Sequence, residues 1–148
     1  MHIAPPTAPA VARLCDFFET LSPASVARFG EFYTEDATFK DPFNEVRGLA
    51  EIKRVFSHMY VALDNPRFEI TAHITEGQQC FLSWNFVFAF KNFKKGETQT
   101  VRGSCHLRLA DDGRVQHHRD YWDTAEELYQ KVPVLGGLVR WLTRHAGG

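Results

Sequence analysis

The residues best suited to chemistry lie close together in one stretch of the chain, from Val115 to Asp123. His118 and Asp120 are two residues apart, so on a β-strand they would lie side by side on one face. Imidazole and carboxylate groups are the side chains that most often move protons in enzymes. The pair could exchange a proton with a ligand hydroxyl or enol. It could also be a buried polar pair that only satisfies its own hydrogen bonds.

The stretch has the character of a β-strand, since Asp111-Asp112-Gly113 predicts a turn just before it and aromatic residues lie at its end. One face would carry His118, Asp120 and Trp122, and the other face His117, Arg119 and Tyr121. Charge on both faces is unusual for a strand with one buried side. Burying a carboxylate costs several kcal/mol, roughly, unless it is paired or neutralised. We therefore expect this strand to line a pocket.

A second candidate carboxylate is Asp41, which shares a strand face with Phe39 and precedes Pro42. In an apolar pocket such a group would serve as a base or proton shuttle. The alternative is a turn residue that binds nearby backbone N–H groups. If Asp41 and Asp120 face each other across a cavity, one of them would hold a proton and act as an acid.

Composition excludes several classes of partner. The chain has 148 residues, 44% of them hydrophobic, which is the size and make-up of one globular domain. Its net charge is -1 and its longest basic run is Lys94-Lys95, so we expect no nucleic-acid binding. The sequence has no apolar run of the roughly 20 residues that a membrane span needs.

We expect neither a metal nor a cofactor. The chain has no glycine-rich phosphate-binding pattern, and the neighbours His117 and His118 would point to opposite faces of a strand. The cysteines Cys15, Cys80 and Cys105 are far apart and have no CxxC spacing. Since no signal peptide is visible either, the sequence favours free thiols in a reducing cytoplasm.

The order of elements predicts an α+β fold, in which helices come first and a curved antiparallel sheet wraps around them. After a flexible lead-in over residues 1–9, the spacing predicts helices and then strands. Residues 34–36 are predicted to be a turn. The expected helices are 10–21, 23–33, 49–63 and 124–131, and the expected strands are 37–41, 67–75, 80–91, 98–109 and 115–123.

The domain would span residues 10–131, followed by a basic amphipathic tail over 132–148. This tail would be a helix that closes the cavity mouth or packs on a partner subunit, or an interfacial membrane anchor.

Two segments carry a resemblance to a known family. They are Phe-Tyr-Thr-Glu-Asp-Ala-Thr-Phe-Lys-Asp-Pro over 32–42, leading into Gly48–Ile52, and Asp-Asp-Gly-Arg-Val-Gln-His-His-Arg-Asp-Tyr-Trp-Asp over 111–123. With the element order, they resemble the nuclear transport factor 2-like superfamily over about residues 10–131. More narrowly they resemble the SnoaL-like proteins, relatives of ketosteroid isomerase and limonene epoxide hydrolase. The resemblance implies a cone-shaped fold with a ligand cavity.

The resemblance also implies roles for single positions. Asp41 matches the isomerase's general base, whereas Phe17 and Cys105 stand where the isomerase has its oxyanion-binding Tyr and Asp. Phenylalanine donates no hydrogen bond and a thiol donates weakly, so steroid isomerisation by that mechanism is not expected. Asp120 matches one catalytic Asp of the epoxide hydrolase.

The hydrolase's Arg–Asp pair on a central strand falls on Trp84 and Phe86, so its hydrolytic mechanism is not expected either. The resemblance implies that His118, Asp120 and Trp122 point into the cavity and that the outer sheet face forms a homodimer.

The sequence thus leads to three hypotheses. The first is a cofactor-independent acid/base enzyme of the isomerase, cyclase or hydrolase type, acting on an apolar ligand that bears a carbonyl or hydroxyl group. The second is a non-catalytic, dimeric ligand-binding or accessory protein, and the third a dimer whose cone is filled. The candidate catalytic residues are Asp41, Asp120 and His118, and the candidate pocket residues are Phe17, Phe39, Trp84, Phe86, Cys105 and Trp122.

Overall fold

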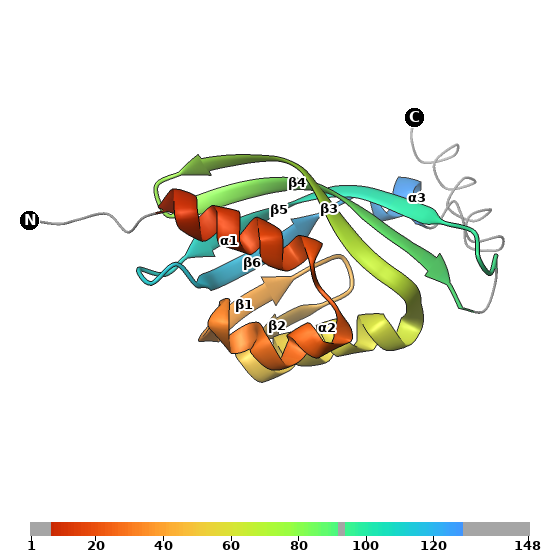
Figure 1. Cartoon of the computed structure of the whole chain (residues 1–148), viewed down its shortest axis with the longest axis horizontal. Coiled ribbons are helices and arrows are strands. Elements are labelled where there is room, and N and C mark those ends of the chain that lie inside the picture. Colours follow the sequence, from red (N-terminus) through yellow and green to blue (C-terminus); the bar gives the residue numbers. More distant parts are fainter. Residues whose placement is uncertain (1–6, 92–93, 129–148) are drawn as a thin grey trace, which may run out of the picture.

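The computed structural model describes residues 7–91 and 94–128 of the chain, as a six-stranded curved sheet partly wrapped around helices (Figure 1). The elements in chain order are α1 (Thr7–Glu19), η1 (Pro23–Glu31, a 3-10 helix), β1 (Tyr33–Lys40), β2 (Glu45–Arg47), α2 (Leu49–Ala62), β3 (Leu63–Glu76), β4 (Gln79–Phe90), β5 (Gln99–Leu109), β6 (Val115–Tyr121) and α3 (Thr124–Glu127).

The sheet has the strand order β2-β1-β6-β5-β4-β3, which confirms the predicted α+β class. Its neighbours are antiparallel except β1 and β6, which run parallel. The prediction of a wholly antiparallel sheet was therefore wrong at one pair. It failed because β1 and β6 are far apart in the chain, so no turn sequence reveals their relative direction.

The first strand is longer than expected. Residues 34–36, predicted to be a turn, lie within β1 at an irregularity, where the register with β6 shifts between Tyr33 and Thr38. Thr34 Oγ1 donates to Asp36 Oδ1 at 2.9 Å inside this bulge. A bulge accommodates such polar residues in a strand because it leaves part of the backbone unpaired. Its consequence is that Tyr33 becomes a strand residue that faces the core.

Strand β3 also contains a bulge. Ile70 pairs with Trp84 but Ala72 pairs with Ser83, so Thr71 is the extra residue. A one-residue slip moves every later side chain to the other face. Ile74, which plain alternation would put on the same face as Ile70, therefore lies on the outer face, pairs with Phe81 and has a side chain that is 72% exposed.

Helix boundaries differ by a few residues from the predicted ones. Helix α1 begins at Thr7, within the expected lead-in, and the segment after Pro23 is a 3-10 helix that ends at Glu31. Helix α3 covers Thr124–Glu127. The predicted continuation to residue 131 and the tail over 132–148 lie outside the described residues.

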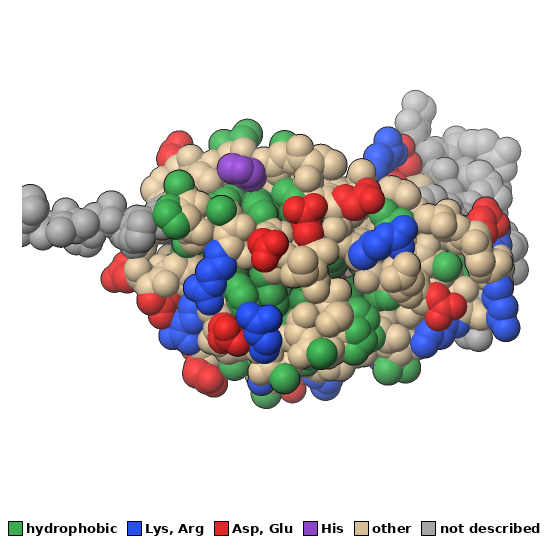
Figure 2. Space-filling view, viewed as in Figure 1, with side chains coloured by type: hydrophobic (Ala, Val, Ile, Leu, Met, Phe, Trp, Pro, Cys, Tyr) green, Lys and Arg blue, Asp and Glu red, His purple; other side chains and the backbone are tan. Residues whose placement is uncertain are grey.

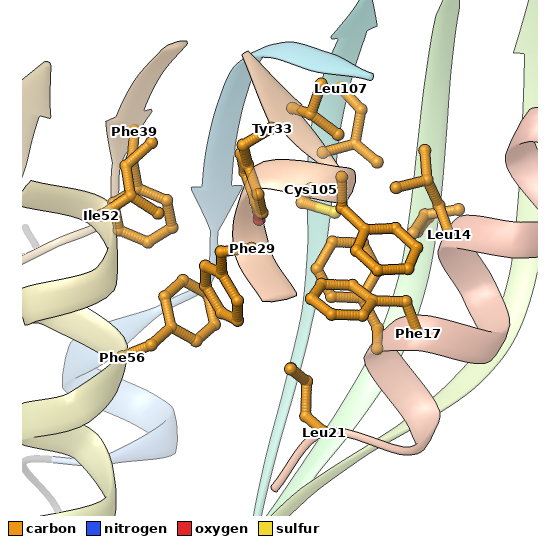
Figure 3. Close-up of a cluster of buried hydrophobic side chains, with 14 of the residues drawn as sticks. Leu14, Phe17, Leu21, Phe29, Tyr33, Phe39, Ile52, Phe56, Cys105 and Leu107 are labelled. Atoms are coloured by element: carbon orange, nitrogen blue, oxygen red, sulfur yellow. The ribbon is translucent and has the colours of Figure 1, made fainter. Parts of the chain in front are cut away.

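The core fills the space between the helices and the concave face of the sheet. In Figure 3, Tyr33 lies between a group of side chains that includes Phe29, Ile52 and Phe56 and a group on the side of Leu14 and Phe17. Tyr33 and Phe29 are fully buried. Phe17 stacks on Phe32 with ring centroids 3.8 Å apart. This dense packing of aromatic rings makes the core between the helices and the sheet rigid.

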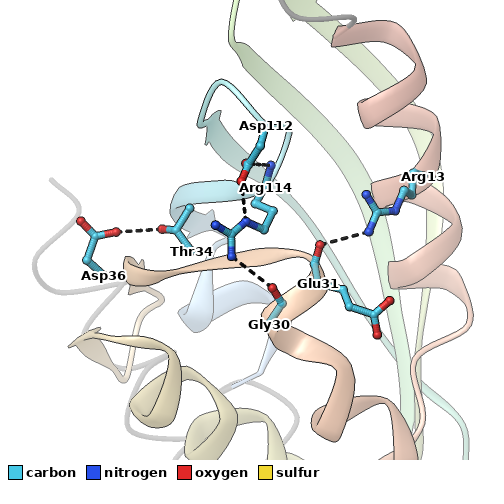
Figure 4. Close-up of polar contacts among 7 residues, drawn as sticks. All are labelled: Arg13, Gly30, Glu31, Thr34, Asp36, Asp112 and Arg114. Carbon is cyan, nitrogen blue, oxygen red and sulfur yellow. Dashed lines mark hydrogen bonds and ion pairs between the residues drawn. The ribbon is translucent and has the colours of Figure 1, made fainter.

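Two arginines fasten η1 to the elements around it (Figure 4). Arg13 on α1 donates to the carbonyl of Glu31 at 3.1 Å. Arg114, held by Asp112 at 2.8 Å, donates to the carbonyl of Gly30 at 3.3 Å. These bonds satisfy carbonyls at the end of η1 and hold the start of β1 in place.

A glycine on β5 makes room for the largest ring of the sheet. Gly103 pairs with Trp84, and a Cβ at Gly103 would lie 2.5 Å from Trp84 Cη2. We expect Gly103→Ala to push the indole aside and to lower the free energy of unfolding by about 1–3 kcal/mol. Urea unfolding followed by tryptophan fluorescence measures this change. The neighbouring Ser104→Ala, which adds no atoms, is the control, and equal stabilities of the two variants would contradict the expected clash.

Candidate functional site

Three side chains from β1 and β6 form a hydrogen-bonded chain that crosses from the core to a cavity. The parallel pairing of the two strands sets Phe39 opposite His118, which brings Tyr33 within reach of the imidazole. Tyr33 Oη lies 2.8 Å from His118 Nδ1, and His118 Nε2 lies 2.8 Å from Asp120 Oδ1. Tyr33 is fully buried, and His118 is only 3% exposed. We refer to Tyr33, His118 and Asp120 as the proton relay.

The hydrogen bonds fit one arrangement of protons along the relay. Burial, and next the charge of Asp120, raise the pKa of Tyr33 well above its usual value, so its hydroxyl remains a donor. A Tyr33 hydroxyl that donates to Nδ1 requires His118 to carry its proton on Nε2, which then donates to Asp120. Both hydrogen bonds of the relay are satisfied in this arrangement.

Aromatic rings fix the orientation of the imidazole. The ring of Phe39 meets that of His118 edge-on at a centroid distance of 4.8 Å, and the ring of Phe18 does so at 5.8 Å. The Tyr33 and His118 rings are nearly parallel, 5° apart. Because these contacts restrict rotation of His118, the imidazole can hold Asp120 in one position.

Asp120 borders a cavity of about 300 Å³ that opens beside α2. The side chain of Asp120 is 15% exposed, so one part of the carboxylate is accessible while Oδ1 is held by His118. The cavity wall is mostly apolar and aromatic. It consists of Phe39, Asp41, Phe43, Asn44, Val55, Phe56, His58, Met59, Ala62, Leu63, Phe68, Trp84, Phe86, Phe88, Phe90, Val101, Asp120, Trp122 and Leu128.

A much smaller void lies behind this cavity. It has a volume of about 10 Å³, and its walls include Phe18, Cys105, His118 and Asp120. That is about the space of a single water molecule. Since Asp120 lines both spaces, its carboxylate lies between them.

Asp41 lines the cavity and also closes a turn. Its Oδ1 accepts hydrogen bonds from the backbone N–H groups of Phe43, at 2.8 Å, and Asn44, at 2.6 Å. The Asn44 side-chain amide lies 3.1 Å from Oδ1 and 3.2 Å from Oδ2. The structure thus shows the turn hydrogen bonds of one alternative and has Asp41 in the cavity wall, while a role as a base stays a prediction. Oδ1 accepts the hydrogen bonds of the turn, whereas Oδ2 has one described contact, with Asn44 Nδ2.

The predicted pocket residues fall into three places. Phe39, Trp84, Phe86 and Trp122 lie in the wall of the cavity. Cys105 borders the small void instead. Phe17 borders neither of these two spaces and packs in the core against Phe29 and Phe32. A place for Phe17 in the ligand pocket stays a prediction.

Sequence reasoning missed three polar residues of the site. Tyr33 was expected at the end of a helix, and its hydrogen bond to His118 joins residues 85 positions apart. Asn44 and His58 line the cavity from the loop after β1 and from the exposed side of α2. No local signal identified Tyr33, because a turn was predicted between it and the strand of Asp41, and its distance to His118 depends on the parallel pairing.

Cys105, His118 and Asp120 each place a potential metal-ligand atom within 4.8 Å of the other two. Both ring nitrogens of His118 are already hydrogen-bonded. Burial, and next the charge of Asp120, raise the pKa of the Cys105 thiol well above its usual value, so it would not readily become the thiolate that metals prefer. A metal would have to break the proton relay, so the arrangement is better suited to proton transfer.

Charged side chains on the face shown in Figure 2 are mixed in sign. On the described part of the face in Figure 2, acidic and basic side chains are interspersed rather than gathered by sign, in keeping with the net charge of -1. None of the helices in residues 7–91 and 94–128 combines the length and the hydropathy of a bilayer-spanning segment.

Fold and site together define a small α+β protein with an apolar cavity between a curved sheet and its helices. A family model described as the SnoaL-like domain matches residues 14–118, so the chain belongs to the SnoaL-like family. No curated protein matches this sequence significantly.

Solved structures with the same fold have low sequence identity to this chain. An LEH-like epoxide hydrolase from Mycobacterium tuberculosis aligns with a TM-score of 0.69 at 17% identity, covering 95% of this chain and 99% of its own. A candidate SnoaL-like polyketide cyclase from Jannaschia sp. CCS1 also gives 0.69 at 17%, covering 85% and 94%.

A further structure is a protein from Catenulispora acidiphila with a ketosteroid isomerase-like fold, in complex with trimethylamine. It gives a TM-score of 0.68 at 16% identity, covering 82% of this chain and 91% of its own. These likenesses confirm the nuclear transport factor 2-like fold.

Proposed function

We propose that this SnoaL-like protein is a cofactor-independent acid/base enzyme that acts on an apolar molecule bound in the cavity. The observation that carries the proposal is the proton relay, which ends on the cavity wall at Asp120. Asp120 Oδ1 is held by His118, and the carboxylate borders a mostly aromatic wall, so its second oxygen can accept a proton from a bound ligand. The ligand would bear a carbonyl or hydroxyl group whose neighbouring proton Asp120 removes and returns.

Each member of the proton relay has a separate role in this mechanism. Asp120 takes the proton and becomes neutral while negative charge develops on the ligand. The Nε2–H of His118 continues to donate to Asp120 Oδ1. The proton taken from the ligand therefore goes to the other oxygen, Oδ2. Tyr33 positions His118 and does not touch the ligand. Asp41 is the second candidate base, but its Oδ1 already accepts three hydrogen bonds from Phe43 and Asn44.

A probe reaction tests the proposal without knowledge of the natural substrate. In 5-nitrobenzisoxazole a base removes the ring C–H proton, the N–O bond breaks and a coloured cyanophenolate forms. We expect the wild-type protein to catalyse this elimination with saturation kinetics. The variant Ala62→Trp, which fills the cavity from α2, should lose catalysis while it stays folded. Equal rates for the wild type and Ala62→Trp would place the reaction outside the cavity and contradict the proposal.

The second candidate function is a non-catalytic binding protein. It is favoured by the aromatic wall and by Phe17 and Cys105 at positions where the isomerase has oxyanion donors. Such a protein would bind 5-nitrobenzisoxazole and quench tryptophan fluorescence through Trp84 and Trp122, which line the cavity. It would not accelerate the elimination above the rate of acetate at equal concentration.

We also propose that two copies pair through the outer face of the sheet. Three large apolar side chains are exposed there: Ile74 by 72%, Phe81 by 47% and Tyr121 by 46%. Phe81 and His106 stack with their ring centroids 4.5 Å apart. Exposed apolar groups on neighbouring strands are typical of protein interfaces.

This pairing makes a testable prediction. We expect Phe81→Asp to convert a dimer into a monomer, because the buried aspartate would have no partner at the interface. Light scattering after size exclusion measures the mass. Val61→Asp is the matched control, since Val61 is 68% exposed on α2, away from the outer face. A wild-type protein that elutes as a monomer would contradict the pairing.

A cytoplasmic location remains part of the proposal. It is supported by the free thiols of Cys15, Cys80 and Cys105, whose pKa values are all raised, first by burial. Thiols of this kind react slowly and fit a reducing compartment.

A further inference from the structure

The cavity has an unbalanced set of charges. Its described wall includes the carboxylates of Asp41 and Asp120 but neither a lysine nor an arginine, and His58 is its one imidazole. An apolar cavity with negative groups and without a fixed cation repels anions. This imbalance bears on the chemical class of the ligand, provided that the cavity is a ligand site as proposed above.

The two carboxylates reach the cavity from β6 and from the loop after β1. Lys40, the last residue of β1, pairs with Arg119, and Asp41 and Asp120 are the next residues along the chain. Both side chains line the same cavity. Neither aspartate has a Lys or Arg partner among the ion pairs of the described residues. Two carboxylates in one apolar cavity without a fixed cation favour a ligand that brings a positive charge.

Each carboxylate keeps an oxygen that can accept a further hydrogen bond. Asp41 Oδ2 has a single described contact, with Asn44 Nδ2 at 3.2 Å, while Oδ1 is bound to the turn. The hydrogen bond of Asp120 to His118 uses Oδ1. The Asp41 carboxylate is fixed by its turn, so it can hold a ligand without losing its own structure.

The rest of the wall is suited to a cation as well. Aromatic faces carry negative electrostatic potential, and a cation within about 6 Å of a ring centroid is attracted to it. Phe43 and Trp122 meet edge-on at 5.8 Å. The rings that line the cavity are Phe39, Phe43, Phe56, Phe68, Trp84, Phe86, Phe88, Phe90 and Trp122.

We infer that the ligand is an apolar molecule that carries a protonated amine, and that the cavity rejects carboxylates and phosphates. The ammonium group lies against Asp41, within the field of Asp120, and the apolar body lies on the aromatic wall. Asp120 then faces the reacting part of the ligand. Asp41 is an anchor in this arrangement and Asp120 is the base.

Three compounds of one shape test the inference. They are 1-naphthylmethylamine, 1-naphthalenemethanol and 1-naphthoic acid, which are cationic, neutral and anionic at neutral pH. Titration calorimetry with the full chain measures their dissociation constants. We expect the amine to bind about 10-fold more tightly than the alcohol and about 100-fold more tightly than the acid. Binding of the acid as tight as that of the amine would overturn the inference.

Variants separate the anchor from the base. Asp41→Asn keeps a carbonyl oxygen for the N–H groups of Phe43 and Asn44, so the turn should persist. It should reduce amine binding about 10-fold and leave alcohol binding unchanged. Asp111→Asn is the control, since Asp111 lies in the turn before β6, outside the cavity wall. Equal amine binding by the Asp41 and Asp111 variants would contradict the anchor.

The outcomes also distinguish this inference from the proposed function. If all three compounds bind equally, the cavity remains a ligand site and the charge preference is overturned. If none binds and 5-nitrobenzisoxazole is not turned over, the proposed function and the inference both fail. If the amine is preferred but the probe reaction is absent, the ligand class stands and the protein is a binder.

Discussion

Asp120→Asn is expected to lower kcat/KM for 5-nitrobenzisoxazole by about 10²- to 10⁴-fold, the range that a positioned general base contributes. The variant keeps the shape of the side chain and an oxygen that can accept from His118 Nε2. It removes the charge and the ability to hold the transferred proton. Because the hydrogen bond to His118 persists, we expect the free energy of unfolding to change by less than about 1 kcal/mol. Stopped-flow absorbance and urea unfolding measure the two quantities.

Two further variants show whether the loss is specific to position 120. Asp41→Asn should reduce the same rate less than 10-fold, roughly, since Asp41 is assigned as an anchor and the probe is neutral. Asp111→Asn, outside the cavity wall, should behave as the wild type. A larger loss for Asp41 than for Asp120 would exchange their roles, and wild-type rates in both cavity variants would end the enzymatic proposal.

Tyr33→Phe is expected to have the largest effect on stability among the single-atom changes at the site. The substitution removes the hydroxyl that donates to His118 Nδ1 and leaves that buried nitrogen without its partner. An unsatisfied buried acceptor costs about 1–3 kcal/mol of unfolding free energy. His118 can then change tautomer, which would release Asp120. We therefore expect kcat for the probe to fall while KM stays the same.

Nitrogen-15 NMR of the histidine rings provides the readout that a purely structural role would not change. We expect a single tautomer with the proton on Nε2 of His118 in the wild type and a mixture in the Tyr33 variant. Tyr121→Phe is the matched control, because it removes the same atom from a side chain that is 46% exposed. An unchanged tautomer in Tyr33→Phe would show that Tyr33 does not position His118.

The parts of the site that the sequence predicted are those set by strand alternation. The period of two placed His118, Asp120 and Trp122 on one face, and the structure has Asp120 and Trp122 in the cavity wall and His118 buried behind it. Trp84 and Phe86, two residues apart on β4, were candidate pocket residues, and both lie in the cavity wall. Such patterns are local, so a single sequence contains them.

The parts that could not be predicted depend on contacts between distant residues. The bulge at Thr71 turned Ile74 outward, and nothing in the composition of that segment indicates the extra residue. The hydrogen bond from Tyr33 to His118 needs the parallel pairing of β1 with β6. Strand β2 has only three residues, Glu45–Arg47, and was missed because two of them are charged.

The most direct test is a crystal structure with 5-nitrobenzotriazole, a stable analogue of the probe whose ring N–H stands in for the reacting C–H. We predict that the analogue fills the cavity beside α2, with its N–H donating to Asp120 and its rings on Trp84. An analogue bound only outside the cavity, or inside it with the N–H directed away from Asp120, would contradict the account.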